Sequence, residues 1–61
     1  MELWIARDRY GLCLYTETPY LLEEENIYTC DGQIIALDVN LFPEVTFENS
    51  PQKVKLELIK E

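Results

Sequence analysis

The sequence predicts an all-β fold: a small antiparallel meander of five to six short strands that forms a bent sheet or a small barrel. Two observations support this prediction. Apolar and polar residues alternate with a period of two in several short runs, and turn-forming residues separate these runs at short intervals. At most one helical turn is expected. The 61 residues make one small β domain, spanning 1–61, and leave no room for a second.

The first predicted element is a β-hairpin. Its strands cover Glu2–Arg7 and Leu12–Glu17, and the polar segment between them ends in Gly11, which can adopt the positive φ of a tight turn. Because both faces of these strands are largely apolar, the hairpin is expected at the centre of the sheet or covered on both sides. Alternation assigns the side chains of the first strand to two faces: Leu3 and Ile5 to one, Trp4 and Ala6 to the other.

A second hairpin is predicted in the middle of the chain. Residues 20–26 precede it and are expected to form a loop or a single helical turn, because so short a helix is not stable by itself. Asp31-Gly32 then joins two β-forming runs, Ile27–Cys30 and Gln33–Leu37. An Asp-Gly pair between such runs is the strongest short signal for a type I′ hairpin turn.

The remainder of the chain is predicted to add two strands. Residues 38–43 form an irregular connection, in which Phe42 is expected to be extended because Pro43 follows it. A short strand is predicted over Glu44–Glu48. The run Gln52–Lys60 alternates most regularly, and its outward lysines suit a sheet edge. The inward residues of this run are Val54, Leu56 and Leu58.

The charge of the chain limits its partners. Twelve acidic and five basic residues give a net charge of −7. This charge opposes direct binding to nucleic acid, because such binding requires Lys and Arg to neutralise phosphates. The same sign opposes docking on an anionic membrane, and no apolar segment approaches the length of a membrane span. A basic protein partner, or imitation of a polyanion, stays open.

Both cysteines, Cys13 and Cys30, fall inside predicted strands. A single disulfide between them is one alternative. Small secreted scaffolds usually carry more cysteines, however, and no signal peptide is recognisable at the start of the sequence. We therefore expect reduced thiols packed as small apolar groups, in a cytoplasmic protein.

Residue types that support catalysis are scarce. The chain contains no histidine, which is the commonest general base and metal ligand. Its one serine, Ser50, precedes a proline in a predicted turn and has no identifiable base. The acidic run Glu23–Glu25 lacks the spacing and central glycine of a calcium loop. The sequence therefore predicts a protein that is not an enzyme and that binds no metal or cofactor.

Three aromatic residues, Trp4, Tyr15 and Tyr28, fall on predicted strands, on the faces that carry Ala6 and the two cysteines. If this face is open, it is a candidate contact surface for a partner, because aromatic side chains are enriched in protein interfaces. The alternative is a second layer of the core. A core layer is favoured, since an exposed apolar patch of this size is uncommon on a monomer.

Two segments carry a resemblance to other proteins. The first runs from Ala6-Arg7-Asp8 through Gly11 to Leu14-Tyr15, and the second is Leu41–Pro51, which reads LFPEVTFENSP. With these segments the chain resembles a group of short bacterial and phage or other mobile-element proteins without an assigned activity. The resemblance implies a genomic setting and no mechanism. Tyr10 departs from the Asp or Asn expected before the turn glycine.

Together these observations predict a small non-catalytic binding or accessory protein, whose partner is another protein or a second copy of the chain. The alternative is an acidic inhibitor that occupies the nucleic-acid site of an enzyme. That alternative requires several carboxylates to line one surface at phosphate-like spacing. The carboxylates in question are those of Glu23–Glu25, Asp31, Asp38, Glu44 and Glu48.

Overall fold

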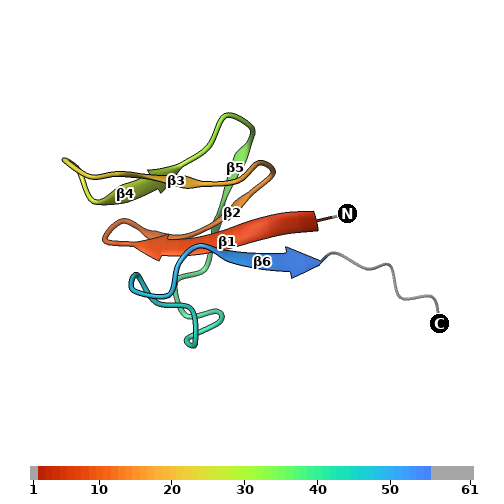
Figure 1. The fold of residues 1–61 in the computed structure, drawn as a ribbon. Helices are drawn as coiled ribbons and strands as arrows, with labels where there is room; N and C mark the ends of the chain where they lie inside the picture. The colour runs from red at the N-terminus through yellow and green to blue at the C-terminus, as the bar shows by residue number, and fades with distance from the viewer. Residues whose placement is uncertain (1, 56–61) are drawn as a thin grey trace.

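A computed structural model describes residues 2–55 of the chain, and this part is built from six β-strands (Figure 1). The predicted all-β class is confirmed. Within residues 2–55 there is no helix, and so none that could cross a membrane. The strands are β1 (Glu2–Asp8), β2 (Gly11–Tyr15), β3 (Tyr20–Leu22), β4 (Ile27–Thr29), β5 (Ile34–Leu37) and β6 (Gln52–Lys55).

The six strands form two antiparallel sheets that do not close into a barrel. Four strands pair in the order β5-β2-β1-β6, and β3 pairs with β4 in a separate hairpin. The predicted meander therefore differs from the observed strand order, because β5 and β6 flank the β1–β2 hairpin on opposite sides. The hairpin is central, as its apolar faces predict. Figure 1 shows the β3–β4 hairpin over one face of this sheet and the chain between β5 and β6 on the other side.

The turn between β1 and β2 has two residues, since Asp8 and Gly11 are the last paired positions. Gly11 has a φ of 140°, a region that favours glycine. The carboxylate of Asp8 accepts a hydrogen bond of 2.9 Å from the backbone N–H of Tyr10. Asp8 thus supplies the polar side chain that Tyr10 lacks, and the predicted hairpin forms despite this departure.

The loop or single turn predicted over residues 20–26 is wrong for Tyr20–Leu22, which form β3, and is confirmed for the four residues that follow, which form a turn. Leu22 pairs with Ile27, and the backbone N–H of Asn26 donates to the carbonyl of Leu22 at 2.8 Å. Asn26 has a φ of 56°, which asparagine tolerates better than most residues. The three glutamates of this segment lie in the turn rather than in a helix.

The predicted hairpin across Asp31-Gly32 is also wrong, since β4 and β5 pair with different strands. Glycine is instead needed at position 32 because the chain there passes close to Thr16 and Glu17, just after β2. The backbone N–H of Gln33 donates to the hydroxyl of Thr16 at 2.8 Å, and the N–H of Thr16 donates to the carbonyl of Gln33 at 3.1 Å. A Cβ on Gly32 would lie 2.7 Å from Cγ of Glu17 and closer still to the Thr16 hydroxyl.

Residues 38–51 form a folded loop, which we call the 38–51 loop. The predicted strand over Glu44–Glu48 is absent from it, and successive turns take its place. One of these turns is closed by a hydrogen bond of 2.9 Å from the N–H of Val45 to the carbonyl of Phe42. Phe42 is not extended as predicted but has a φ of 49°. The irregular connection expected over residues 38–43 is confirmed.

The predicted edge strand is confirmed as β6, which pairs with β1 alone among the strands of residues 2–55. Nζ of Lys53 lies 2.9 Å from a carboxylate oxygen of Glu2. The predicted inward residues Leu56 and Leu58 lie outside the described residues.

The central sheet has a core on each face. The groove-side core lies on the face next to the 38–51 loop, which carries an apolar groove, and contains Ile5, Leu12 and Val45. The hairpin-side core lies on the face covered by the β3–β4 hairpin and contains Ala6, Tyr15 and Cys30. The alternation of the two faces along the first strand is confirmed. Half-buried side chains complete both cores: Leu14, Leu37 and Val54 on the groove side, and Trp4, Cys13 and Tyr28 on the hairpin side.

The close approach at Gly32 predicts that Gly32→Ala lowers the free energy of unfolding by about 1–3 kcal/mol, as overpacking typically does. Urea unfolding followed by tryptophan fluorescence measures this loss. In a Thr16→Ala background the clash with the hydroxyl is gone, so the same substitution is expected to cost less. Equal losses in the two backgrounds would contradict the packing of Gly32 against Thr16.

Candidate functional site

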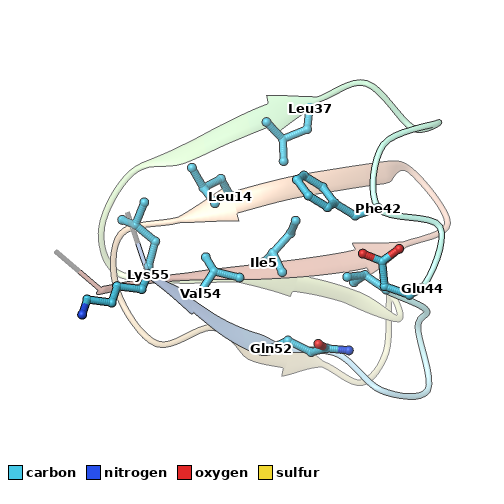
Figure 2. Close-up of a pocket in the computed structure, with 10 residues that line it drawn as sticks. Ile5, Leu14, Leu37, Phe42, Glu44, Gln52, Val54 and Lys55 are labelled. Atoms are coloured by element: carbon cyan, nitrogen blue, oxygen red, sulfur yellow. The ribbon is translucent and has the colours of Figure 1, made fainter. Parts of the chain in front are cut away.

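An apolar groove of about 480 Å³ lies on the face of the central sheet opposite the β3–β4 hairpin (Figure 2). Its floor is formed by side chains from all four strands of this sheet, and its wall by the 38–51 loop. Glu44 and Lys55 lie at opposite ends of it in Figure 2. The lining residues are Leu3, Ile5, Leu14, Leu37, Phe42, Glu44, Val45, Gln52, Val54 and Lys55.

The guanidinium of Arg7 fixes the wall of the groove. Nη1 donates to the carbonyl of Val39 at 2.8 Å, and Nη2 donates to those of Leu41 at 2.9 Å and Phe42 at 3.1 Å. Nε donates to the carbonyl of Val45. One side chain on β1 therefore satisfies four carbonyls of a loop more than thirty residues away, using the fixed fork of donors that only arginine offers.

Ser50 provides a second connection between β1 and the loop. The backbone N–H of Arg7 donates to its hydroxyl at 3.0 Å, and that hydroxyl donates to the carbonyl of Thr46. The hydroxyl of Tyr28 donates to the Ser50 carbonyl at 2.9 Å. Arg7 and Ser50 together hold both halves of the loop against β1, which explains why this segment keeps a defined shape without a strand.

Phe42 lies at the mouth of the groove. Its side chain is 49% exposed and projects toward Leu14 and Leu37 (Figure 2). Its φ of 49° is left-handed, a conformation that costs a bulky residue about 1–3 kcal/mol and persists only where the surroundings enforce it. The hydrogen bond from Arg7 to its carbonyl supplies part of that enforcement. The result is a positioned aromatic ring that can pack against an apolar group in the groove.

Exposed apolar side chains continue from the groove onto β5 and the adjoining loop. Surfaces of this kind on small proteins often mark contact sites. No acidic or basic side chain interrupts residues 33–37, which end in Leu37 of the groove floor. The large side chains that are about half exposed on β5 and this loop are Ile34, Ile35, Val39, Leu41 and Phe42, of which Ile34 lies on the opposite face of the sheet, across from Tyr15.

Reactive groups do not converge at the groove. Among residues 2–55, no three histidine, cysteine or carboxylate side chains lie close enough together to hold a metal ion. Comparison with protein-family models, curated proteins and solved structures finds no match for this chain. The geometry of the site is that of an open, mostly apolar groove.

The predicted contact residues Trp4, Tyr15 and Tyr28 come together on the other face of the sheet, in the hairpin-side core. Tyr15 is 1% exposed, and its hydroxyl donates to the carbonyl of Tyr28 at 3.3 Å. Trp4 and Tyr28 are half-buried, and Nζ of Lys53 lies 5.8 Å from the Trp4 ring centre. The three aromatic residues thus form the layer between the sheet and the β3–β4 hairpin.

Both cysteines are free thiols, and Cys30 is buried. Burial raises the pKa of the Cys13 thiol, and the negative charge of Asp8 raises it further, while a hydrogen bond with Tyr15 acts in the opposite direction. A thiol with a raised pKa is protonated at neutral pH and is a weak nucleophile. This environment fits a packing role for Cys13.

The acidic residues of the inhibitor alternative lie on three separate segments. Glu23–Glu25 occupy the β3–β4 turn, Asp31 lies between β4 and β5, and the others belong to the 38–51 loop. Figure 1 places these segments at different ends of the molecule. Asp31 accepts a hydrogen bond of 3.4 Å from the Tyr20 hydroxyl, and Asp38 accepts one of 2.8 Å from the Asn40 N–H. Their arrangement gives no specific support to a polyanion mimic.

Arg7 and Phe42 were not among the residues predicted to form a site. One signal was available for Arg7: in β1 it follows Leu3 and Ile5 on the same face, so a charged side chain stands in an apolar series. Such a residue needs polar partners from another segment. Nothing local identifies Phe42, because its position depends on hydrogen bonds from a distant strand.

We predict that Arg7→Lys lowers the free energy of unfolding by about 1.5–3 kcal/mol, the usual contribution of hydrogen bonds to a charged group. Lysine cannot reproduce the four-carbonyl contact because its donors arise from a single atom. Arg9→Lys is the matched control: Arg9 is exposed and contacts Tyr10, so a change within about 0.5 kcal/mol is expected. Chemical unfolding measures both, and equal effects would contradict the role of Arg7.

We also predict that stability falls at alkaline pH. Burial raises the pKa of Tyr15, with the charges of Cys13 and Asp8 adding to this effect, and the pKa of the Cys13 thiol is raised as well. Both groups are neutral when protonated, and burial favours this neutral form in the folded protein. Their contribution to the free energy of unfolding is therefore full below the unfolded pKa values, about 8.5 and 10, and is lost as the pH rises above them. Urea unfolding between pH 7 and 11 measures the slope.

Tyr15→Phe is expected to make this decline shallower, since the most strongly shifted group is removed. Tyr10→Phe serves as the control, because Tyr10 is 73% exposed and should leave the slope unchanged. A slope that is the same in all three proteins would show that Tyr15 does not carry the alkaline dependence.

Proposed function

We propose that this protein is a small non-catalytic binding module whose groove receives apolar side chains of another protein. The observation that carries the proposal is Phe42, an aromatic residue held in a left-handed conformation at the mouth of an apolar groove. Residues held in costly backbone conformations cluster at functional sites. Two features of the groove support a functional role for Phe42.

The first feature is the composition of the surface. Protein interfaces have an apolar centre and a polar margin, and aromatic residues supply much of their binding energy. The groove has an apolar floor, an exposed aromatic ring, and Glu44 and Lys55 at its ends. A partner side chain placed on the floor would be enclosed by Phe42 and desolvated.

The second feature is the openness of the site. Small-molecule sites bury most of the ligand surface. Here Leu41 and Phe42, on the loop that walls the groove, are each about half exposed, and exposed apolar residues continue onto β5. An extended surface of this form fits a polypeptide better than a small ligand.

The net charge favours another protein over a second copy of the chain. Two copies would each bring a charge of −7 to the contact, whereas a partner with basic residues would be attracted. The same charge opposes nucleic acid as the ligand. The proposal places the protein in the cytoplasm, where two free cysteines are stable as thiols.

Site-specific photo-crosslinking tests the proposal. A benzophenone amino acid is introduced at position 42 or, as a control, at position 47, and the protein is irradiated in the cell that produces it. Phe47 is an aromatic residue of the same loop, 36% exposed against 49% for Phe42, but its ring packs against that of Tyr28 and it does not line the groove. We expect a polypeptide adduct several-fold stronger from position 42.

Equal adducts at the two positions, or none at position 42, would contradict the proposal. An adduct between two copies of the chain at position 42 would contradict the choice of partner. It would show the groove to be a self-association site instead.

A further inference from the structure

β5 presents an unpaired edge next to the groove. It ends the four-stranded sheet, and among residues 2–55 no strand pairs with its outer side. In Figure 2, β5 forms the upper margin of the sheet, with Leu37 pointing into the groove. Open edges of this kind can pair with an added strand.

The register shows which backbone groups of β5 point outward. The carbonyl of Gln33 accepts a hydrogen bond from the N–H of Thr16, so the odd-numbered residues of β5 direct their polar groups toward β2. Hydrogen-bonding direction alternates along a strand. The N–H and C=O groups of Ile34 and Ala36 therefore face the open edge.

The two edges of the sheet differ in protection. The β6 edge carries Lys53 and Lys55, and Lys53 pairs with Glu2. Charged side chains of this kind discourage pairing with other strands. Residues 33–37 at the β5 edge carry no charge, and Ile34 and Ile35 are about half exposed. The β5 edge therefore lacks the protection that the β6 edge has.

Acidic side chains lie at both ends of this uncharged edge. Asp31 precedes β5 and Asp38 follows it, and both are exposed. The basic residues of the described chain lie elsewhere, on β1, the β1–β2 turn and β6. A segment laid along β5 thus meets an apolar centre with a carboxylate beyond each end.

Building on the proposed function, we infer that β5 receives an extended segment of the partner, which pairs as a fifth strand of the sheet. The segment carries a short run of β-branched or other apolar residues with Lys or Arg on either side. Its backbone pairs with Ile34 and Ala36. Its side chains on the groove face extend the apolar surface of Ile35 and Leu37 beyond the edge of β5, so that backbone pairing and this face contribute to one interface with the groove beside it.

A second copy is the disfavoured occupant of this edge. Antiparallel pairing of β5 with itself would bring two chains of charge −7 together and place Asp31 and Asp38 of both copies along one seam. Like charges close together across an interface oppose association. A segment with basic ends has the complementary charge.

Selection from a random twelve-residue peptide library on the immobilised protein tests this inference. We expect enriched peptides with alternating apolar residues and an excess of Lys and Arg at their ends. Added to ¹⁵N-labelled protein, the most enriched peptide should shift the amide signals of Ile34 and Ala36. N-methylation of alternate peptide amides should weaken binding at least about ten-fold, since it removes the donors that strand pairing needs.

Replacing the terminal Lys and Arg of that peptide by Glu should also weaken binding at least about ten-fold at low salt, and by less at high salt. Binding that is unaffected by N-methylation, or that leaves the Ile34 and Ala36 signals unshifted, would overturn the inference. So would the absence of any enriched peptide, or self-pairing of the protein at β5. None of these results depends on the crosslink at position 42, which tests the proposed function separately.

Discussion

Hydrogen bonds from the Arg7 guanidinium hold the 38–51 loop against the central sheet. Four carbonyls of the 38–51 loop, which has no strand of its own, accept hydrogen bonds from this one side chain. They determine where the loop lies, the conformation of Phe42 and the wall of the groove. They also join two segments that are far apart in the sequence, since Arg7 lies on β1 and the four carbonyls belong to residues 39–45.

Elements that depend on alternation and local turns were predictable from the sequence. The β1–β2 hairpin, its central place, the division of its faces and the edge strand β6 all follow from such signals. The predictions are wrong where contacts with a distant segment determine the local structure. Asp31-Gly32 has the sequence of a hairpin turn, but pairing of β5 with β2 sends the chain across to the other sheet. Residues 44–48 have the composition of a strand, yet their backbone is folded into turns.

The candidate site was less predictable than the fold, because each of its parts is a long-range relation. Alternation identified Leu3 and Ile5 as one face of β1, but it could not tell which face the β3–β4 hairpin would cover. That hairpin covers Trp4 and Tyr15, and the opposite face is left with the groove. The sequence shows that residues 33–37 carry no charge, but only the strand order shows that this run lies at an edge of the sheet.

The most direct test of this account is the hydrogen exchange of the Arg7 side chain, measured by NMR on the folded protein. If the guanidinium is bound to the loop carbonyls, its Nε–H should exchange at least about ten-fold more slowly than that of the exposed Arg9 and show contacts to residues 39–45. Equal exchange rates for the two arginines, without such contacts, would mean that the loop, Phe42 and the groove are not held as described.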